Sequence, residues 1–279
     1  MNMTNHNKQK KIAVINDYTG FGRCSLAVAM PIISQLRIQC CPVPTSIFSD
    51  HTGFESYFFD DYTDKMQAYI DEWAKLGLRF NGILTGFLGS AGQIETVRRF
   101  IEDFGDGDTK VIIDPVMGDN GKPYPTYTSD MCERMKELVC HADILTPNLT
   151  EACILTDTPY TPESFTAADY RTLSRKLLDT GAEKIVISGI SMGSFIANAI
   201  CERGKEPLLL KQKRIGHERS GTGDVFSAII AAESVRGTDF VQSVRKASEF
   251  VKKCIRVTEE FDIPPTDGVC FEEVLHELK

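Results

Sequence analysis

Residues 219–229 read RSGTGDVFSAI, a turn of small residues that leads directly into an apolar helical stretch. Glycines permit a tight turn, and the first backbone N–H groups of a helix have no partner inside it. The partial positive charge at this end favours an anion such as phosphate. Asp224 falls in the first helical turn, where a carboxylate can accept a proton from an attacking hydroxyl. The alternative interpretation is an acidic cap on an ordinary glycine turn.

Around this turn, strand-like apolar runs alternate with amphipathic helical stretches. The alternation predicts an α/β fold with a mostly parallel central sheet and helices on both faces. Because such sheets bind ligands at the carboxyl ends of their strands, the loops after strands are the expected site. Strands are expected at 12–15, 40–45, 82–85, 111–113, 143–145 and 184–188, with an antiparallel pair at 194–201 and 207–213. Helices are expected at 24–36, 61–76, 90–104, 129–140, 167–180, 222–236 and 239–257, with a short one after Pro147.

Length and composition narrow the class of protein. The 279 residues favour a single domain over 1–279, with a polar tail at 1–10. A net charge of −8 disfavours a nucleic-acid binder. The basic run 211–214 is interpreted as a solvated strand end or loop, and the alternative is that it guides an anionic substrate. No apolar run approaches the ~20 residues of a membrane span. Nine cysteines without a C-x-x-C pair indicate reduced thiols in a cytoplasmic protein, not disulfides or a zinc site.

Carboxylates follow two other expected strands. Asp114 and Asp119, in the stretch DPVMGD, could hold Mg²⁺ through water, although Asp114 could also merely cap the turn that Pro115 begins. In TPNLTE, Asn148 and Glu151 lie on one face of a first helical turn. They could face a phosphate or metal-bound water, and a capping box is at least as good an interpretation.

Two stretches with less specific patterns suggest a substrate pocket. NDYTGFG at 16–22 follows the first strand and is either a substrate-contacting loop or an ordinary turn. FSDHTG at 48–53 could form one wall of a heteroaromatic pocket. His51 within it is expected to be structural.

These motifs, in this order and together with TGFLGS at 85–90, resemble the pyridoxal (vitamin B6) kinases of the ribokinase-like superfamily along nearly the whole chain. The resemblance implies a three-layer fold with a mainly parallel sheet, often with a small lid. It implies transfer of the ATP γ-phosphoryl to the 5′-hydroxymethyl group of pyridoxal, pyridoxamine or pyridoxine. Mg²⁺, a monovalent cation such as K⁺, a homodimer and a cytoplasmic location are implied as well.

The resemblance also implies a role for each matching residue. Asp224 would be the catalytic base, and Gly221, Thr222 and Gly223 would line an anion hole. Asn148 and Ser188 would approach the ATP phosphates, Asp114, Asp119 and Glu151 would serve Mg²⁺, and Phe48, Thr52 and Phe87 would form the pyridine pocket. The family commonly has Tyr where Phe87 stands, so a hydroxyl contact is lost while stacking is retained.

Asp17 stands where many members of the family carry a small hydroxyl residue. A carboxylate there could pair with the pyridine nitrogen or with an amine substituent, which would favour pyridoxamine or pyridoxine over pyridoxal. The alternative is that Asp17 faces solvent or holds its own loop.

Two other functions remain open. A hydroxymethylpyrimidine kinase would share the ATP chemistry and differ only in the pocket. A non-catalytic vitamer-binding protein would bind without turnover, but the complete set of phosphate-handling residues disfavours it.

Overall fold

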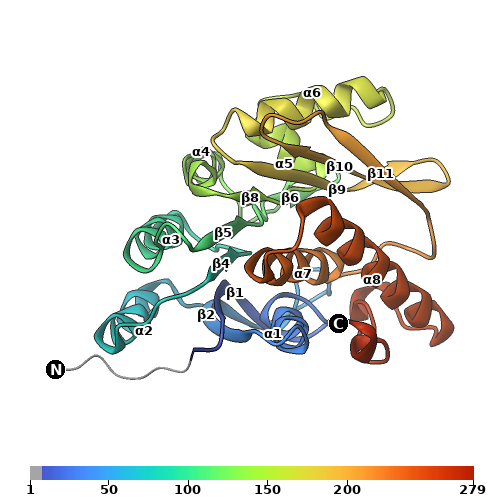
Figure 1. The fold of residues 1–279 in the computed structure, drawn as a ribbon. Helices are drawn as coiled ribbons and strands as arrows, with labels where there is room; N and C mark the ends of the chain where they lie inside the picture. The colour runs from blue at the N-terminus through green and yellow to red at the C-terminus, as the bar shows by residue number, and fades with distance from the viewer. Residues whose placement is uncertain (1–7) are drawn as a thin grey trace. The chain divides into compact units, whose positions relative to one another are not determined.

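The computed structural model describes residues 8–279 and divides the chain into two compact units (Figure 1). Unit 1 comprises Met1–Lys110 and Ile215–Lys279, and unit 2 comprises Val111–Arg214. Of the tail expected at 1–10, residues 1–7 lie outside the described residues, and residues 8–10 are exposed. The single kinase domain over 1–279 stays a prediction.

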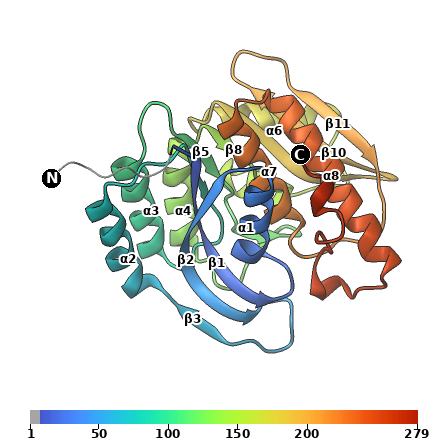
Figure 2. The same cartoon turned by 60° about the horizontal axis from the view of Figure 1, so that its bottom comes forward.

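Unit 1 is built on strands in the order β4-β1-β2-β3. β1 pairs in parallel with both β2 and β4, and the short β3 is antiparallel to β2. Figures 1 and 2 show α2 and α3 on one side of these strands and α1 and α7 on the other. The elements are β1 (Lys11–Phe21), α1 (Ser25–Gln35), β2 (Gln39–Asp50), β3 (Phe59–Asp61), α2 (Thr63–Leu76), β4 (Gly82–Thr85), α3 (Ala91–Phe104), α7 (Thr222–Arg236) and α8 (Phe240–Glu260), with short 3₁₀ turns at Pro265–Asp267 and Leu275–Glu277.

Unit 2 has strands in the order β11-β10-β9-β8-β5. In this sheet β5, β8 and β9 are parallel, while β10 and β11 complete an antiparallel meander. The elements are β5 (Lys110–Ile113), the hairpin β6 (Gly118–Asp119) and β7 (Lys122–Pro123), α4 (Ser129–Leu138), a 3₁₀ turn at Val139–His141, β8 (Ile144–Leu145), α5 (Leu149–Leu155), α6 (Ala167–Leu178), β9 (Lys184–Met192), β10 (Phe195–Glu202) and β11 (Leu208–Lys213). The predicted α/β class with a mostly parallel sheet is therefore confirmed.

Two helices begin or end at residues whose types favour helix caps. Ser90 caps α3 by accepting from the backbone N–H of Gln93 at 3.1 Å. Gly77 closes α2 in the left-handed conformation with φ +65°, as a C-terminal glycine does. None of the helices within residues 8–279 is both long and apolar enough to cross a membrane.

Several strands are longer than the sequence predicts. β1 continues to Phe21 and β2 to Asp50, so residues 16–21 belong to a strand and not to a loop. The two strands stay paired beyond the buried part, with a register shift between Asn16 and Tyr18. Because Tyr18 and Phe21 are exposed there, the apolar run that identifies a buried strand is missing. The small strand β3 and the hairpin β6–β7 were not expected either.

An aromatic cluster holds α2 and α3 together in unit 1. The ring of Phe100 stacks on Phe104 at 4.5 Å between centroids and lies 5.9 Å from Phe80 and 6.3 Å from Trp73. Phe100 is 1% exposed, so truncating its side chain would leave a cavity among these rings.

We expect Phe100→Ala to lower the free energy of unfolding by about 3–5 kcal/mol, because both buried area and ring contacts are lost. Leu76→Ala, at the exposed end of α2, should change it by no more than about 0.5 kcal/mol. Urea unfolding followed by circular dichroism measures both. Equal losses in the two variants would contradict this account of the core.

Candidate functional site

The turn before α7 is shaped by the close approach of another backbone. Gly221 is the N-cap residue of α7 and has φ +78°. A Cβ atom there would collide with the carbonyl oxygen of Arg23. Only glycine meets both conditions, because other residues rarely adopt this φ and none lacks a side chain. The N–H groups at the start of α7 therefore lie in a turn whose shape the chain fixes.

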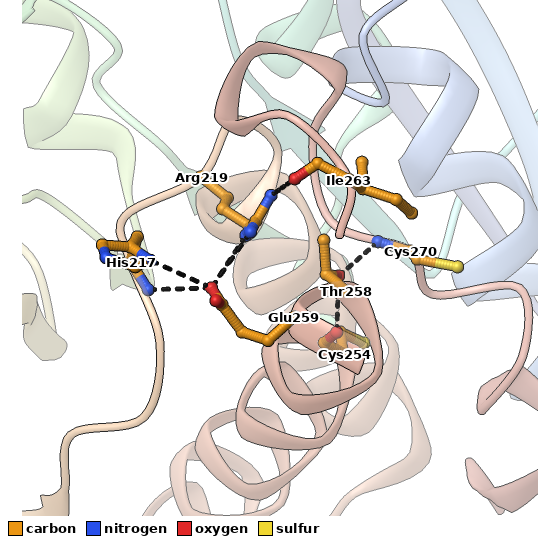
Figure 3. A network of polar contacts seen from close by, with 7 residues as sticks. All are labelled: His217, Arg219, Cys254, Thr258, Glu259, Ile263 and Cys270. Carbon is orange, nitrogen blue, oxygen red and sulfur yellow. Dashed lines mark hydrogen bonds and ion pairs between the residues drawn. The ribbon is translucent and has the colours of Figure 1, made fainter. Parts of the chain in front are cut away.

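A buried arginine anchors this turn to α8 (Figure 3). Arg219 donates from Nη2 to Glu259 at 3.0 Å and from Nη1 to the carbonyl oxygen of Ile263. Its own carbonyl accepts from the Thr222 hydroxyl at 3.1 Å. Glu259 also accepts from the backbone N–H of His217 at 3.0 Å, and this bond, followed by those from Arg219, lowers the pKa of the carboxyl. No role was predicted for Arg219 from the sequence, although it is the first residue of the stretch RSGTGD.

Asp224 lies in the first turn of α7 and is only partly exposed. Its carboxylate accepts from Nδ2 of Asn16 at 3.3 Å and from the backbone N–H of Ser25. Burial raises the pKa of Asp224 to about 6, and the nearby charge of Asp17 adds to the rise, while the hydrogen bonds oppose it. A carboxylate with this pKa is ionised at neutral pH and is a better proton acceptor than an ordinary aspartate.

Asp17 is 5% exposed, and its two carboxylate oxygens are both engaged. Oδ2 accepts from the hydroxyl of Thr19 and Oδ1 from that of Ser25, each at 2.6 Å. Burial raises the pKa of Asp17, and these hydroxyls oppose the rise. The geometry favours the alternative interpretation of this residue, in which the carboxylate holds its own segment of chain.

Aromatic rings gather around Phe48 in unit 1. Phe48 is 6% exposed, and its ring lies 6.0 Å from Phe87, 4.7 Å from Phe59 and 5.8 Å from Tyr57. The structure thus brings together two of the three residues expected around a heteroaromatic ring. Phe59 and Tyr57 were missed, and the aromatic run YFF at 57–59 was the signal for them.

Thr52 is exposed in the segment between β2 and β3. The adjacent His51 fixes this segment, because Nε2 donates to the carbonyl oxygen of Thr266 at 2.7 Å and Nδ1 accepts from the N–H of Gly53 at 3.0 Å. Both ring nitrogens are therefore used structurally, as the sequence suggested for this histidine.

In unit 2, Asn148 and Glu151 form a capping box at the start of α5. Oδ1 of Asn148 accepts from the N–H of Glu151 at 2.9 Å, and Oε2 of Glu151 accepts from the N–H of Asn148 at 2.7 Å. Nδ2 of Asn148 donates to the carbonyl oxygen of Gly118 at 2.8 Å. Asn148 also forms an isolated parallel bridge with Ser188, so these two predicted residues are neighbours.

Glu151 is 3% exposed and belongs to an acidic group. Burial, and then the charges of Asp114 and Asp119, raise the pKa of Glu151 well above its ordinary value. Among residues 8–279, however, no three His, Cys, Asp or Glu side chains form a cluster that could hold a metal ion alone. Mutually repelling carboxylates suit a hard cation such as Mg²⁺, which keeps several waters and takes phosphate oxygens as further ligands.

Comparisons with known proteins show which proteins the chain resembles as a whole. The model of the family described as phosphomethylpyrimidine kinase matches residues 32–268. A candidate phosphomethylpyrimidine kinase from Bacteroides thetaiotaomicron, crystallised in a form with pyridoxal, is 35% identical, with a TM-score of 0.93 over 97% of this chain and 96% of that chain.

Two curated relatives are named as kinases of pyridoxal or related compounds. The pyridoxine/pyridoxal/pyridoxamine kinase of Bordetella avium is 28% identical over 87% of this chain and 83% of its own. A candidate pyridoxal kinase of Schizosaccharomyces pombe is 28% identical over 68% of this chain, and the match spans 58% of that protein.

The glycine turn can be tested with two variants of the same helix. Gly221→Ala should lower the free energy of unfolding by about 2–4 kcal/mol, because a strained φ and a backbone collision add. Gly237→Ala, at the other end of α7, has φ +87° but meets nothing within 4 Å, and should cost about 1 kcal/mol. Denaturant unfolding compares them. A loss for Gly221→Ala no greater than that for Gly237→Ala would contradict the close approach to Arg23.

Proposed function

The chain belongs to the phosphomethylpyrimidine kinase family, and from this premise we propose that it is a vitamin B6 kinase. The reaction is transfer of the ATP γ-phosphoryl to the 5′-hydroxymethyl group of pyridoxal, pyridoxamine or pyridoxine. One observation carries the proposal: a carboxylate with a raised pKa, Asp224, lies at the N-terminal turn of a helix in the unit that also holds the aromatic group around Phe48. The pyridoxal in the Bacteroides thetaiotaomicron crystals supports the choice of substrate.

Asp224 acts as the base in this proposal. An alcohol is a far weaker acid than a carboxylic acid with a pKa of about 6, so full deprotonation before attack is unfavourable. Asp224 orients the substrate oxygen and takes its proton late, as the P–O bond forms, because such transfers pass through a loose transition state. The N–H groups of the turn formed by Gly221, Thr222 and Gly223 stabilise charge on the phosphoryl oxygens.

In this proposal, residues of unit 2 would bind the ATP phosphates and Mg²⁺. Asn148 and Ser188, neighbours across the bridge, would contact ATP phosphates. Asp114, Asp119 and Glu151 would hold Mg²⁺, mainly through water. Bound Mg²⁺ neutralises the phosphate tail of ATP. Asp114 and Glu151 would thereby be relieved of their mutual repulsion.

The pyridine ring of the vitamer would stack against Phe48 and Phe87, with Thr52 contributing a hydroxyl from the exposed segment. Selection among vitamers by Asp17 stays a prediction, and its two hydroxyl partners support the structural alternative. If Asp17→Ser had the same relative activities with the three vitamers as the wild type, Asp17 would have no selective role.

Three further expectations complete the proposal. All nine cysteines are free thiols, which supports a cytoplasmic location. A homodimer and activation by K⁺ stay predictions from the resemblance. Light scattering of the purified protein and assays with K⁺ replaced by Na⁺ would check them.

Turnover tests the proposal directly. ATP consumption should depend on a B6 vitamer and Mg²⁺, and Asp224→Asn should lower kcat by a factor of about 10² or more while ATP affinity is little changed. Because the carboxyl must be ionised to accept a proton, kcat should fall as the pH drops below about 6. The assay is run with pyridoxal, pyridoxamine, pyridoxine and hydroxymethylpyrimidine.

If only hydroxymethylpyrimidine were turned over, the phosphoryl-transfer chemistry would stand and the substrate would be a pyrimidine, in line with the description of the matching family. Vitamer binding without any turnover would contradict the kinase itself. Activity that survives nearly intact in Asp224→Asn would show that another group is the base.

A further inference from the structure

Asn16 connects three segments of unit 1 through one side chain. It lies in β1 and is 5% exposed. Oδ1 accepts from the backbone N–H of Phe87 at 2.8 Å and from that of Asp17 at 2.9 Å. Nδ2 donates to Oδ1 of Asp224 at 3.3 Å. Since the amide cannot turn over without losing both backbone bonds, its donor end is fixed toward Asp224.

The chain makes room for this amide at Gly86. A Cβ atom on Gly86 would collide with the carboxamide group of Asn16. Gly86 follows β4, and its N–H donates to the carbonyl oxygen of Ile15 at 2.8 Å, which continues the pairing of β4 with β1. The glycine therefore lets the two backbones stay paired while the side chain of Asn16 lies across the end of β4.

A second donor to Asp224 comes from Ser25, the first residue of α1. The backbone N–H of Ser25 bonds to the carboxylate of Asp224, and Ser25 has φ +57°, a conformation that costs free energy in a residue with a side chain. The hydroxyl of Ser25 donates to Asp17, which holds the strained residue in place. Such strain persists where surrounding contacts over-determine it.

We propose that Asn16 is a positioning residue for the proposed base: it fixes the orientation of the Asp224 carboxylate and keeps it ionised, and it does not bind the vitamer. The proposal rests on the proposed function, because it assigns Asn16 a role only through Asp224. A hydrogen bond donated to the charged form of an acid stabilises that form. Asn16 thus opposes the effect of burial on the base.

The charged and titratable groups around Asp224 define what else could shift its titration. Asp17, in β1, is the charged neighbour that acts on Asp224, and His51 acts in turn on Asp17. The Cys24 thiol precedes α1, and burial together with the charges of Asp224 and Asp17 raises its pKa, so it stays protonated. Neither Asp17 nor Cys24 donates a hydrogen bond to Asp224. Its described donors are the side chain of Asn16 and the backbone N–H groups of Ser25 and of Asp224 itself.

Asn16→Asp is the sharpest test, because a carboxylate is nearly isosteric with the amide. The new side chain can still accept from the N–H groups of Phe87 and Asp17, but it loses the donor to Asp224 and adds a like charge. We expect the acid limb of the kcat–pH profile to move up by about one pH unit or more, with the KM of the vitamer within about twofold of wild type. At pH 6.5, where a shift of one unit lowers the ionised fraction of the base from about three quarters to about one quarter, kcat should fall about threefold or more.

Asn81→Asp is the matched control. Oδ1 of Asn81 also accepts a backbone N–H, that of Lys11 at 2.9 Å, but at the opposite end of β1. Its pH profile should superimpose on that of the wild type. Asn16→Asp should also be combined with Asp224→Asn, whose residual turnover can be followed at high enzyme concentration. If Asn16 acts through Asp224, adding Asn16→Asp to Asp224→Asn should change that residual rate by less than about twofold.

Circular dichroism and unfolding of each variant exclude a general loss of fold. If Asn16→Asp were too unstable, Asn16→Ala, which adds no charge, should still raise the acid limb, though by less. An unshifted limb in a folded variant, alongside an inactive Asp224→Asn, would overturn this proposal and leave the proposed function standing. A raised vitamer KM with unchanged kcat would overturn it too, in favour of substrate contact. Near wild-type turnover by Asp224→Asn would refute the base itself and this proposal with it.

Discussion

A carboxylate that is largely shielded from water needs hydrogen-bond donors from the protein, and unit 1 supplies them to Asp224. Burial raises its pKa to about 6, and two donors from separate segments, Asn16 and Ser25, hold it on the ionised side at neutral pH. The balance between these effects is the functional property. A fully solvated aspartate would be a weaker base, and an unsupported buried one would be neutral and could not accept a proton.

The fold brings these donors to one place by backbone geometry. The parallel pairing of β1 with β4 places Asn16 beside the N–H of Phe87. Gly221 allows the start of α7 to approach the carbonyl oxygen of Arg23, and Ser25 accepts a left-handed backbone two residues later. Arg219 secures the preceding segment to α8. The unusual backbone conformations of Gly221 and Ser25 therefore both lie next to the proposed base.

Much of this could be predicted from the sequence, because the evidence was local. The glycine turn, Asp224 in the first turn of its helix, and the caps at Ser90 and Gly77 depend on neighbours a few residues away. Asn16 could not be found in this way, since its partner Asp224 is 208 residues along the chain. The continuation of β1 past residue 15 was hidden for a related reason: paired but exposed strands lack an apolar pattern.

The most direct test is a titration of the Asp224 carboxyl group by NMR, in protein labelled with ¹³C at aspartate side-chain carboxyls, with Asp224→Asn for assignment. The account predicts one aspartate resonance that titrates near pH 6 in the wild type and is missing in the variant. Labelling aspartate alone keeps Glu151 out of the spectrum. If the resonance lost in Asp224→Asn titrates near the ordinary value of about 4, burial does not tune this carboxylate and the account of the base is wrong.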